Sequence, residues 1–164
     1  MAAPGVPPLT PQPRQFDPSL LSAEALIKEK EIEYVDLRFT DPRGKLQHLT
    51  MDGKMVDEEM LNEGVFFDGS SIAGWKAINE SDMILKPDLE RQIIDPFTSH
   101  NTLVLFCDVL DAVKKDPYER DPRSIAKKAE TYLKKSGIGD KAYFGPEAEF
   151  FVFDDVKYKN DMNE

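Results

Sequence analysis

The sequence contains only one cysteine, Cys107, so the chain cannot form an intrachain disulfide. Because Cys107 ends the apolar run of residues 103–107, we expect a buried structural thiol in a reducing cytoplasm rather than a catalytic residue. No apolar stretch approaches the roughly 20 residues that span a bilayer, which argues against an integral membrane protein. A basic excess is also absent: 21 basic and 31 acidic residues give a net charge of −10. This balance argues against nucleic acid or an anionic membrane surface as the main partner.

The first part of the chain changes composition near residue 19. Residues 1–18 carry almost no charge but hold six of the twelve prolines, which predicts a disordered or polyproline-like tail. This tail lacks the basic start and apolar centre of a signal peptide, and it is too rich in proline for an amphipathic transit helix. Residues 22–30 then fit a helix with Ser22 at its N-cap.

Residues 33–64 predict a strand, a second strand and a helix. Apolar and polar residues alternate over residues 33–40, and a type I turn with proline second and glycine fourth leads to a returning strand at residues 45–51. A short helix is expected over residues 56–62, closed by Gly64.

A long polar loop is expected next, over residues 65–82. Its sequence, VFFDGSSIAGWKAINESD, is too polar and too often broken by glycine for a regular element, and an ordered loop of this length is usually functional. We then expect a short strand over residues 83–85, a turn at Pro87-Asp88, and a strand over residues 102–109 that is buried on both faces. Asp121 and Pro122 begin the clearest helix, which ends at Gly137.

Residues 143–153 read YFGPEAEFFVF and predict a strand after a break at Gly145-Pro146. Side chains alternate along a strand, so Glu147 and Glu149 would share one face with their Cβ atoms roughly 6–7 Å apart. A hard divalent cation, Mg²⁺ or Mn²⁺, would offset the cost of placing two carboxylates in an apolar strand. The alternative is an ordinary two-faced strand with both glutamates in water, and spacing alone favours that alternative.

Five stretches occur in a characteristic order along the chain: VDLRFTDPRGKLQH, FFDGSSIAGWKAINESDM, IDPF, DPRSIAKKAE and FGPEAEFFVFDDV. Together they resemble the N-terminal part of bacterial-type (type I) glutamine synthetases, the glutamate–ammonia ligases, over about residues 22–157. The resemblance implies an α+β fold, with a β-grasp domain over residues 19–113 and the first helix and strand of an incomplete catalytic domain over residues 114–164. The Pro-rich residues 1–18 lie outside the family pattern.

The resemblance also implies site residues. Glu147 and Glu149 match ligands of the family's paired Mg²⁺/Mn²⁺ site, with Glu149 holding the metal nearer glutamate and Glu147 the metal nearer the ATP phosphates. Asp68 matches the carboxylate that reaches a neighbouring subunit's site, binds ammonium and helps to deprotonate it. Without the resemblance, Asp68 would be assigned a simple Asx turn. Ser71 and Asp82 match further polar positions of the same loop.

The implied activity is ATP-dependent ligation of ammonia to glutamate through γ-glutamyl phosphate, in a cytoplasmic ring-forming homo-oligomer. Trp75 is expected to pack at an interface, whereas His48 and His100 match no catalytic position. Because family chains are more than twice as long, we expect these 164 residues alone to be inactive. Two alternatives remain open: a non-catalytic β-grasp module that docks on full-length synthetase subunits, or a ligase of the same superfamily acting on another amine.

Overall fold

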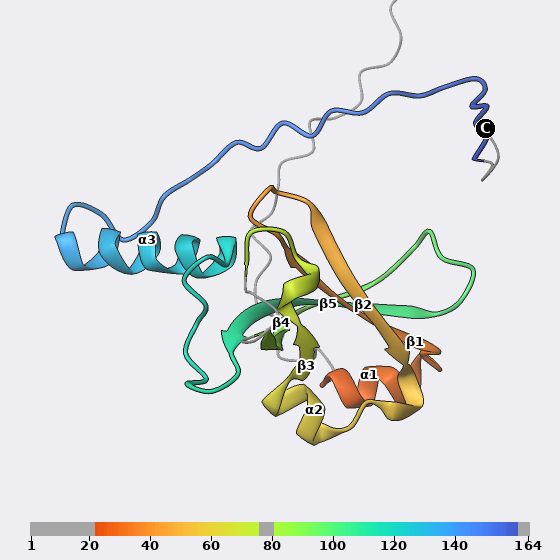
Figure 1. The fold of residues 1–164 in the computed structure, drawn as a ribbon, viewed down its shortest axis with the longest axis horizontal. Helices are drawn as coiled ribbons and strands as arrows, with labels where there is room; N and C mark the ends of the chain where they lie inside the picture. Colours follow the sequence, from red (N-terminus) through yellow and green to blue (C-terminus); the bar gives the residue numbers. More distant parts are fainter. Residues whose placement is uncertain (1–21, 76–80, 161–164) are drawn as a thin grey trace, which may run out of the picture. The chain divides into compact units, whose positions relative to one another are not determined.

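The computed structural model describes residues 22–75 and 81–160 (Figure 1). The tail predicted over residues 1–18 and the loop residue Ile78 lie outside the described residues. The chain divides into two compact units, residues 1–128 and residues 129–164. The helices and strands follow in the order α1 (Ala23–Glu29), β1 (Tyr34–Thr40), β2 (Leu46–Asp52), η1 (Gly53–Met55), α2 (Glu58–Glu63), β3 (Val65–Asp68), η2 (Gly69–Ser71), β4 (Asp82–Ile94), β5 (Thr102–Asp111) and α3 (Pro122–Ser136).

Five strands form one mixed sheet in the order β2-β1-β5-β4-β3 (Figure 1). The pair β1–β5 is parallel, and the other three neighbouring pairs are antiparallel. The predicted hairpin of β1 and β2 is confirmed: the Gly44 N–H donates to the Asp41 carbonyl at 3.0 Å and closes the turn. With α1 and α2 contributing to the same core, the α+β β-grasp prediction is confirmed.

The core lies between one face of the sheet and the helices. Along β1 and β5 the inward residues have exposed fractions of 0–4%, and they are Val35, Leu37, Phe39, Leu103, Leu105, Cys107 and Val109. Ala23 of α1 and Leu61 of α2 complete the cluster from the helical side. Burial of each Val, Leu or Phe side chain in this cluster stabilises the fold by about 1.5–3 kcal/mol. Burial also raises the pKa of the Cys107 thiol to about 12, and the predicted burial of this cysteine is confirmed.

The segment after α2 is more regular than the sequence predicts. Val65–Asp68 forms β3 at the edge of the sheet, because pairing with β4 satisfies its backbone and Phe67 packs against the core. The helix α2 begins at Glu58, two residues later than expected, since the Asp57 carboxylate caps the Met60 N–H at 2.8 Å.

The strand β4 is a single element of 13 residues, where the sequence predicts a short strand followed by a turn. Its pairing with β5 is irregular between Pro87 and Gln92. A proline has no N–H to donate to a ladder, and such an irregularity is the usual place for it inside a strand. The Pro87-Asp88 turn prediction was therefore wrong, and the strand continues to Ile94.

The helix α3 begins at Pro122 as predicted. The Asp121 carboxylate accepts hydrogen bonds from the Ser124 N–H at 3.1 Å and from its hydroxyl at 2.9 Å. Gly137, with a φ of +70°, follows the last helical residue. The domain boundary predicted between residues 113 and 114 stays a prediction.

Candidate functional site

Asp68 ends β3 and begins the turn that follows it. Its Oδ1 accepts hydrogen bonds from the Ser70 backbone N–H at 2.8 Å and from the Ser70 hydroxyl at 2.7 Å, the geometry of an Asx turn. The Ser70 hydroxyl is the largest cause that lowers the pKa of Asp68 below its usual value, followed by the Ser70 N–H, with a smaller contribution from the Ser81 side chain. The side chain is exposed, so Asp68 presents an oriented anion to solvent.

Asp82 is the first residue of β4 and lies directly opposite Asp68 in the antiparallel register. Residues opposite each other on neighbouring strands project from the same face, with their Cβ atoms about 4.5–5.5 Å apart. Two exposed carboxylates at such positions repel each other unless a positive charge lies near them. The structure thus brings Asp68 and Asp82 together, whereas Ser71 lies at the exposed end of the η2 turn.

Gly69 allows the Asp68 turn to lie tightly against the start of β4. Its N–H donates to the Ser81 carbonyl at 2.7 Å, and a Cβ added at Gly69 would approach the Met83 sulfur to 2.2 Å. No side chain fits at that distance, so the glycine is required by close approach rather than by its φ. The sequence predicted an ordered glycine-broken loop without regular structure, and the structure shows a packed 3₁₀ turn at this position.

Trp75 ends the first described part of this loop and is 6% exposed. Its ring lies against three other aromatic rings, with centroid distances of 5.2–6.0 Å within the cluster, contributed by Phe39, Phe67 and Tyr118. The expectation of packing at an interface was therefore wrong for the described chain, because these partners all come from the same unit.

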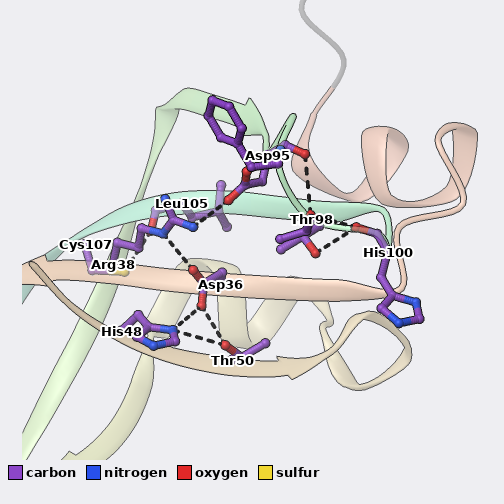
Figure 2. Close-up of polar contacts among 11 residues, drawn as sticks. Asp36, Arg38, His48, Thr50, Asp95, Thr98, His100, Leu105 and Cys107 are labelled. Carbon is purple, nitrogen blue, oxygen red and sulfur yellow. Dashed lines mark hydrogen bonds and ion pairs between the residues drawn. The ribbon is translucent and has the colours of Figure 1, made fainter. Parts of the chain in front are cut away.

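A polar cluster that the sequence analysis missed connects β1 with β2 (Figure 2). Asp36 Oδ2 accepts a hydrogen bond from Arg38 Nε at 2.7 Å, and Nη2 of the same guanidinium donates to Asp95 Oδ2 at 2.7 Å. Asp36 Oδ1 accepts from the Thr50 hydroxyl at 2.7 Å and lies 2.8 Å from His48 Nδ1. The hairpin turn was the sequence feature that could have predicted this cluster, because the register of the hairpin places Thr50 opposite Asp36 and His48 opposite Arg38.

Asp36 is 4% exposed, yet it stays ionised. Burial raises the pKa of Asp36, but hydrogen bonds from Thr50, Arg38 and His48 outweigh it and hold the pKa below its usual value. The cluster lines a shallow hollow of about 440 Å³, whose remaining lining residues are Tyr34, Thr98, Ser99, His100 and Thr102. Because both oxygens of Asp36 already accept hydrogen bonds, we assign the cluster a structural role.

Glu147 and Glu149 lie in residues 141–160, which contain no helix or strand (Figure 1). The strand predicted here was wrong for the described chain, because a strand needs a neighbour for its backbone hydrogen bonds and the sheet includes no part of this segment. Both glutamates are exposed, and residues 22–75 and 81–160 contain no group of three or more His, Cys, Asp or Glu that could hold a metal ion. The pair has ligand chemistry that suits a hard divalent cation, but it would supply only part of a coordination shell.

Comparison with protein families gives two matches in chain order. The family described as "Glutamine synthetase, beta-Grasp domain" matches residues 31–112, and the one described as "Glutamine synthetase, catalytic domain" matches residues 119–164. The glutamine synthetase of Rhizobium meliloti is 67% identical over 135 residues, which are 82% of this chain and 29% of that protein. That of Azospirillum brasilense is 59% identical over 138 residues, 84% of this chain and 30% of that protein. The chain therefore spans less than a third of the length of these relatives.

Solved structures share the fold. Plasmodium falciparum glutamine synthetase, determined by cryo-electron microscopy, superposes with a TM-score of 0.63 at 29% identity, over 70% of this chain and 22% of that chain. The apo form of GmaS superposes with a TM-score of 0.62 at 22% identity, over 70% of this chain and 26% of that chain, and at this identity the likeness concerns the fold alone.

Proposed function

The chain belongs to the glutamine synthetase family, and we propose that it contributes the N-terminal part of a glutamate–ammonia ligase. One observation carries the proposal: both family descriptions match in order, with 67% identity to a named glutamine synthetase. In the proposed reaction, the γ-carboxylate of glutamate attacks the γ-phosphorus of ATP and releases ADP. Ammonia then attacks the γ-carbonyl carbon of γ-glutamyl phosphate, and inorganic phosphate leaves to give glutamine.

In this proposal Asp68 binds ammonium in the site of a neighbouring subunit and accepts its proton. A carboxylate attracts a cation, and ammonium must lose a proton before its nitrogen can act as a nucleophile. Three observations support the role: the side chain is exposed, it is oriented by Ser70, and its pKa is held below the usual value. A low pKa keeps Asp68 anionic and so supports the binding of ammonium, whereas the proposed transfer of a proton to Asp68 rests on the closeness of the two groups.

Asp82 and Ser71 are proposed to assist Asp68. The Asp82 carboxylate lies opposite Asp68 in the sheet register, so it adds negative potential where the ammonium would bind. Ser71 ends the η2 turn that follows Asp68, and its hydroxyl lies on the exposed side of the chain. Together these residues would form the ammonium-facing part of the site.

Glu147 and Glu149 are proposed to hold divalent metal, Mg²⁺ or Mn²⁺, together with ligands that the described residues do not supply. Both side chains are exposed carboxylates, the ligand type that such ions prefer. When bound, the ions would offset the negative charge of the ATP phosphates and of glutamate. Glu149 is assigned the ion nearer glutamate, and Glu147 the ion nearer ATP.

Neighbouring synthetase subunits are the proposed protein partners, and the cytoplasm is the proposed location. Residues 141–160 expose several large apolar side chains, with exposed fractions from 67% to 90%, which would gain stability from cover by other protein: Tyr143, Phe144, Phe150, Phe151, Val152, Phe153, Val156 and Tyr158. A buried free thiol at Cys107 suits a reducing compartment. None of the helices in the described part of the chain is long and apolar enough to cross a membrane.

A hybrid protein tests the proposed function. The 135 aligned residues of the Rhizobium meliloti glutamine synthetase are replaced by the matching residues of this chain, and glutamine formation is measured with ATP, glutamate and ammonium. We expect activity within about tenfold of the unaltered relative, because a tenfold change corresponds to only about 1.4 kcal/mol. A hybrid that folds and assembles but forms no glutamine would contradict the proposal.

Asp52 offers a matched control for Asp68 within the same hybrid. Each carboxylate accepts a hydrogen bond from the backbone N–H two residues later, at 2.8 Å, and each precedes a three-residue 3₁₀ turn. Asparagine keeps this cap while removing the charge. We expect Asp68→Asn to lower kcat/KM for ammonium by about 100-fold or more, whereas Asp52→Asn leaves it unchanged. If the two variants have the same kcat/KM for ammonium, Asp68 has only a structural role in its turn.

The metal assignment has its own test. We expect Glu149→Gln to raise the Mn²⁺ concentration needed for half-maximal Mn²⁺ binding by at least about tenfold, measured by the electron paramagnetic resonance signal of free Mn²⁺ in the hybrid. Glu119→Gln, another exposed glutamate, is the control and should change nothing. Unchanged Mn²⁺ binding in Glu149→Gln would refute the assignment.

A further inference from the structure

Residues 117–121, where the second family-matched region begins, are firmly attached to β5. The Tyr118 N–H donates to the Val109 carbonyl at 2.8 Å, and Pro117 forms an isolated bridge with Leu110. Asp121, which is 0% exposed, accepts a hydrogen bond from the Val109 N–H at 3.4 Å through its Oδ2. These contacts make the segment a fixed part of the sheet unit.

Two side chains of this segment hold the end of the loop that begins at Asp68. The Tyr118 ring, 9% exposed, meets Trp75 edge to face with a centroid distance of 5.7 Å and an interplanar angle of 71°. Arg120 Nη1 donates to the Gly74 carbonyl at 3.0 Å and to the Trp75 carbonyl at 3.4 Å. A single cationic nitrogen thus holds two consecutive backbone carbonyls.

Gly74 has the backbone conformation of a turn residue, with a φ of +89°. A residue with a side chain rarely adopts this φ, so the glycine permits the turn at which both carbonyls are presented to Arg120. Hydrogen bonds from a charged donor are roughly twice as strong as neutral ones, which suits a contact that must hold a loop.

Consecutive turns connect this contact with the Asp68 carboxylate. The Trp75 N–H donates to the Ile72 carbonyl at 3.2 Å, and the Ile72 N–H donates to the Gly69 carbonyl at 3.1 Å. Asp68 accepts from the Ser70 N–H at 2.8 Å within the same run. The turns from Asp68 to Trp75 are therefore linked by hydrogen bonds, and Arg120 holds the end of this run.

We propose that Arg120, supported by Tyr118, is a positioning residue that holds the loop of residues 68–75 and thereby fixes the Asp68 carboxylate for ammonium. The inference rests on the proposed function, and it adds a residue from the start of the region that matches the catalytic-domain family. Arg120 does not touch the reacting atoms. Its effect on the reaction comes through the geometry of the loop, since small displacements of a binding group cost large factors in rate.

The first test uses the 164-residue chain and does not depend on activity. In Arg120→Met, we expect the Ile72 and Trp75 amide protons to exchange with solvent about tenfold faster, because the loop opens more often. Leu37 and Leu105, in the core strands, should exchange at the unaltered rate, which shows that the variant folds. Arg91→Met replaces an exposed arginine in β4 and serves as the matched control.

The second test measures ammonium dependence in the hybrid protein. We expect Arg120→Met to raise the KM for ammonium by about tenfold with little change in the KM for ATP. Arg120→Lys keeps the charge and one donor nitrogen, so it should restore part of the loss. If Arg120→Met is unstable in the hybrid, Tyr118→Leu is used instead. It removes the ring contact with Trp75 at the same end of the loop, and it should also raise the KM for ammonium.

The outcomes separate the two proposals. Unchanged exchange of the Ile72 and Trp75 amides in Arg120→Met overturns the positioning role, whatever the activity. Faster exchange with an unchanged KM for ammonium also overturns it, provided that Asp68→Asn impairs the hybrid. If Asp68→Asn itself has no effect, the role of Asp68 in the proposed function fails, while the amide exchange still decides whether Arg120 holds the loop.

Discussion

Two segments of this chain were both predicted to be strands but lie in opposite environments. In β1, Asp36 lies between Val35 and Leu37, and both apolar neighbours are 0% exposed. In residues 141–160, Glu149 precedes Phe150 and Phe151, which are 84% and 87% exposed. The strand β1 has partners on both sides, β2 and β5, whereas no strand of the described sheet pairs with the later segment. A segment with strand-forming residues thus becomes a strand only where neighbouring strands are present.

The acidic residues of these two segments also differ in the partners that surround them. Asp36 is buried because three side chains of the hairpin donate to it or lie against it, namely Arg38, His48 and Thr50. Glu147 and Glu149 are exposed, and their predicted partners are metal ions and further ligands. A carboxylate in an apolar strand therefore needs donors, and the hairpin supplies them for Asp36 from within the unit.

The largest expected effect on the free energy of unfolding comes from removing an apolar side chain of the core. Leu105→Ala should lower the free energy of unfolding by about 3 kcal/mol, because it removes buried surface and leaves a cavity in the central strand β5. Urea unfolding followed by circular dichroism and by the fluorescence of Trp75, the single tryptophan, measures the change. A loss below about 1 kcal/mol would show that the core of residues 22–128 is looser than its burial indicates.

The second-largest effect on the free energy of unfolding is expected at the buried carboxylate of Asp36. Asp36→Asn should lower the free energy of unfolding by about 2 kcal/mol, because an amide cannot accept all the hydrogen bonds made to both oxygens. The folded pKa of Asp36 lies below its unfolded value of about 3.9, so the ionised group stabilises the fold above that pH.

This stabilisation should disappear as the pH falls through the folded pKa of Asp36. Urea unfolding between pH 7 and pH 2 should therefore show an acid-dependent loss of stability that is smaller in Asp36→Asn than in the unaltered chain. Identical pH profiles would mean that the loss arises from other carboxylates.

A smaller effect is expected where α3 begins. Arg123 donates to Asp88 at 2.6 Å and to Asp108 at 3.0 Å, and its side chain is 27% exposed. Arg123→Met should lower the free energy of unfolding by about 1 kcal/mol, since it leaves two partly buried carboxylates with fewer donors. Lys134→Met, which removes only an exposed pair with Glu130, is the control and should change stability by less than about 0.5 kcal/mol.

The smallest effect is expected in residues 141–160. Phe151→Ser should change the free energy of unfolding of the chain by less than about 0.5 kcal/mol, because the side chain is already 87% exposed. The same substitution in the assembled hybrid should destabilise it, as burial by other protein is part of the proposed function. A loss above 1 kcal/mol in the isolated chain would place Phe151 in a packed environment and remove the contrast between the two segments.

Sequence patterns predicted local structure well where each element carries its own signals. Ser22, Gly64 and Asp121 mark helix ends as expected, and the hairpin turn predicted the pairing of β1 with β2. The prediction failed for β3, which ends at Asp68 directly before the glycine-containing turn η2, and for the continuity of β4 across Pro87. In both cases a neighbouring strand outweighed the local preference, and no local pattern reports where that neighbour lies.

The candidate site was predictable as a set of residues but not as a geometry. The resemblance identified Asp68, Ser71, Asp82, Glu147 and Glu149, whose roles remain predictions. The pairing of Asp68 with Asp82 needed the register of β3 and β4, and the contact of Arg120 with Gly74 spans 46 residues of chain. Contacts between residues so far apart depend on how the strands are ordered in the sheet.

Residue types and short spacings were enough to predict the helix ends, the hairpin and the burial of alternating residues in β1, and the motifs of the chain identified the family. Three features depended on the fold: which of the segments predicted as strands joined the sheet, which carboxylate was buried, and which arginine contacts the loop after Asp68. Backbone pairing and charge compensation require partners, and the fold sets which partners are close.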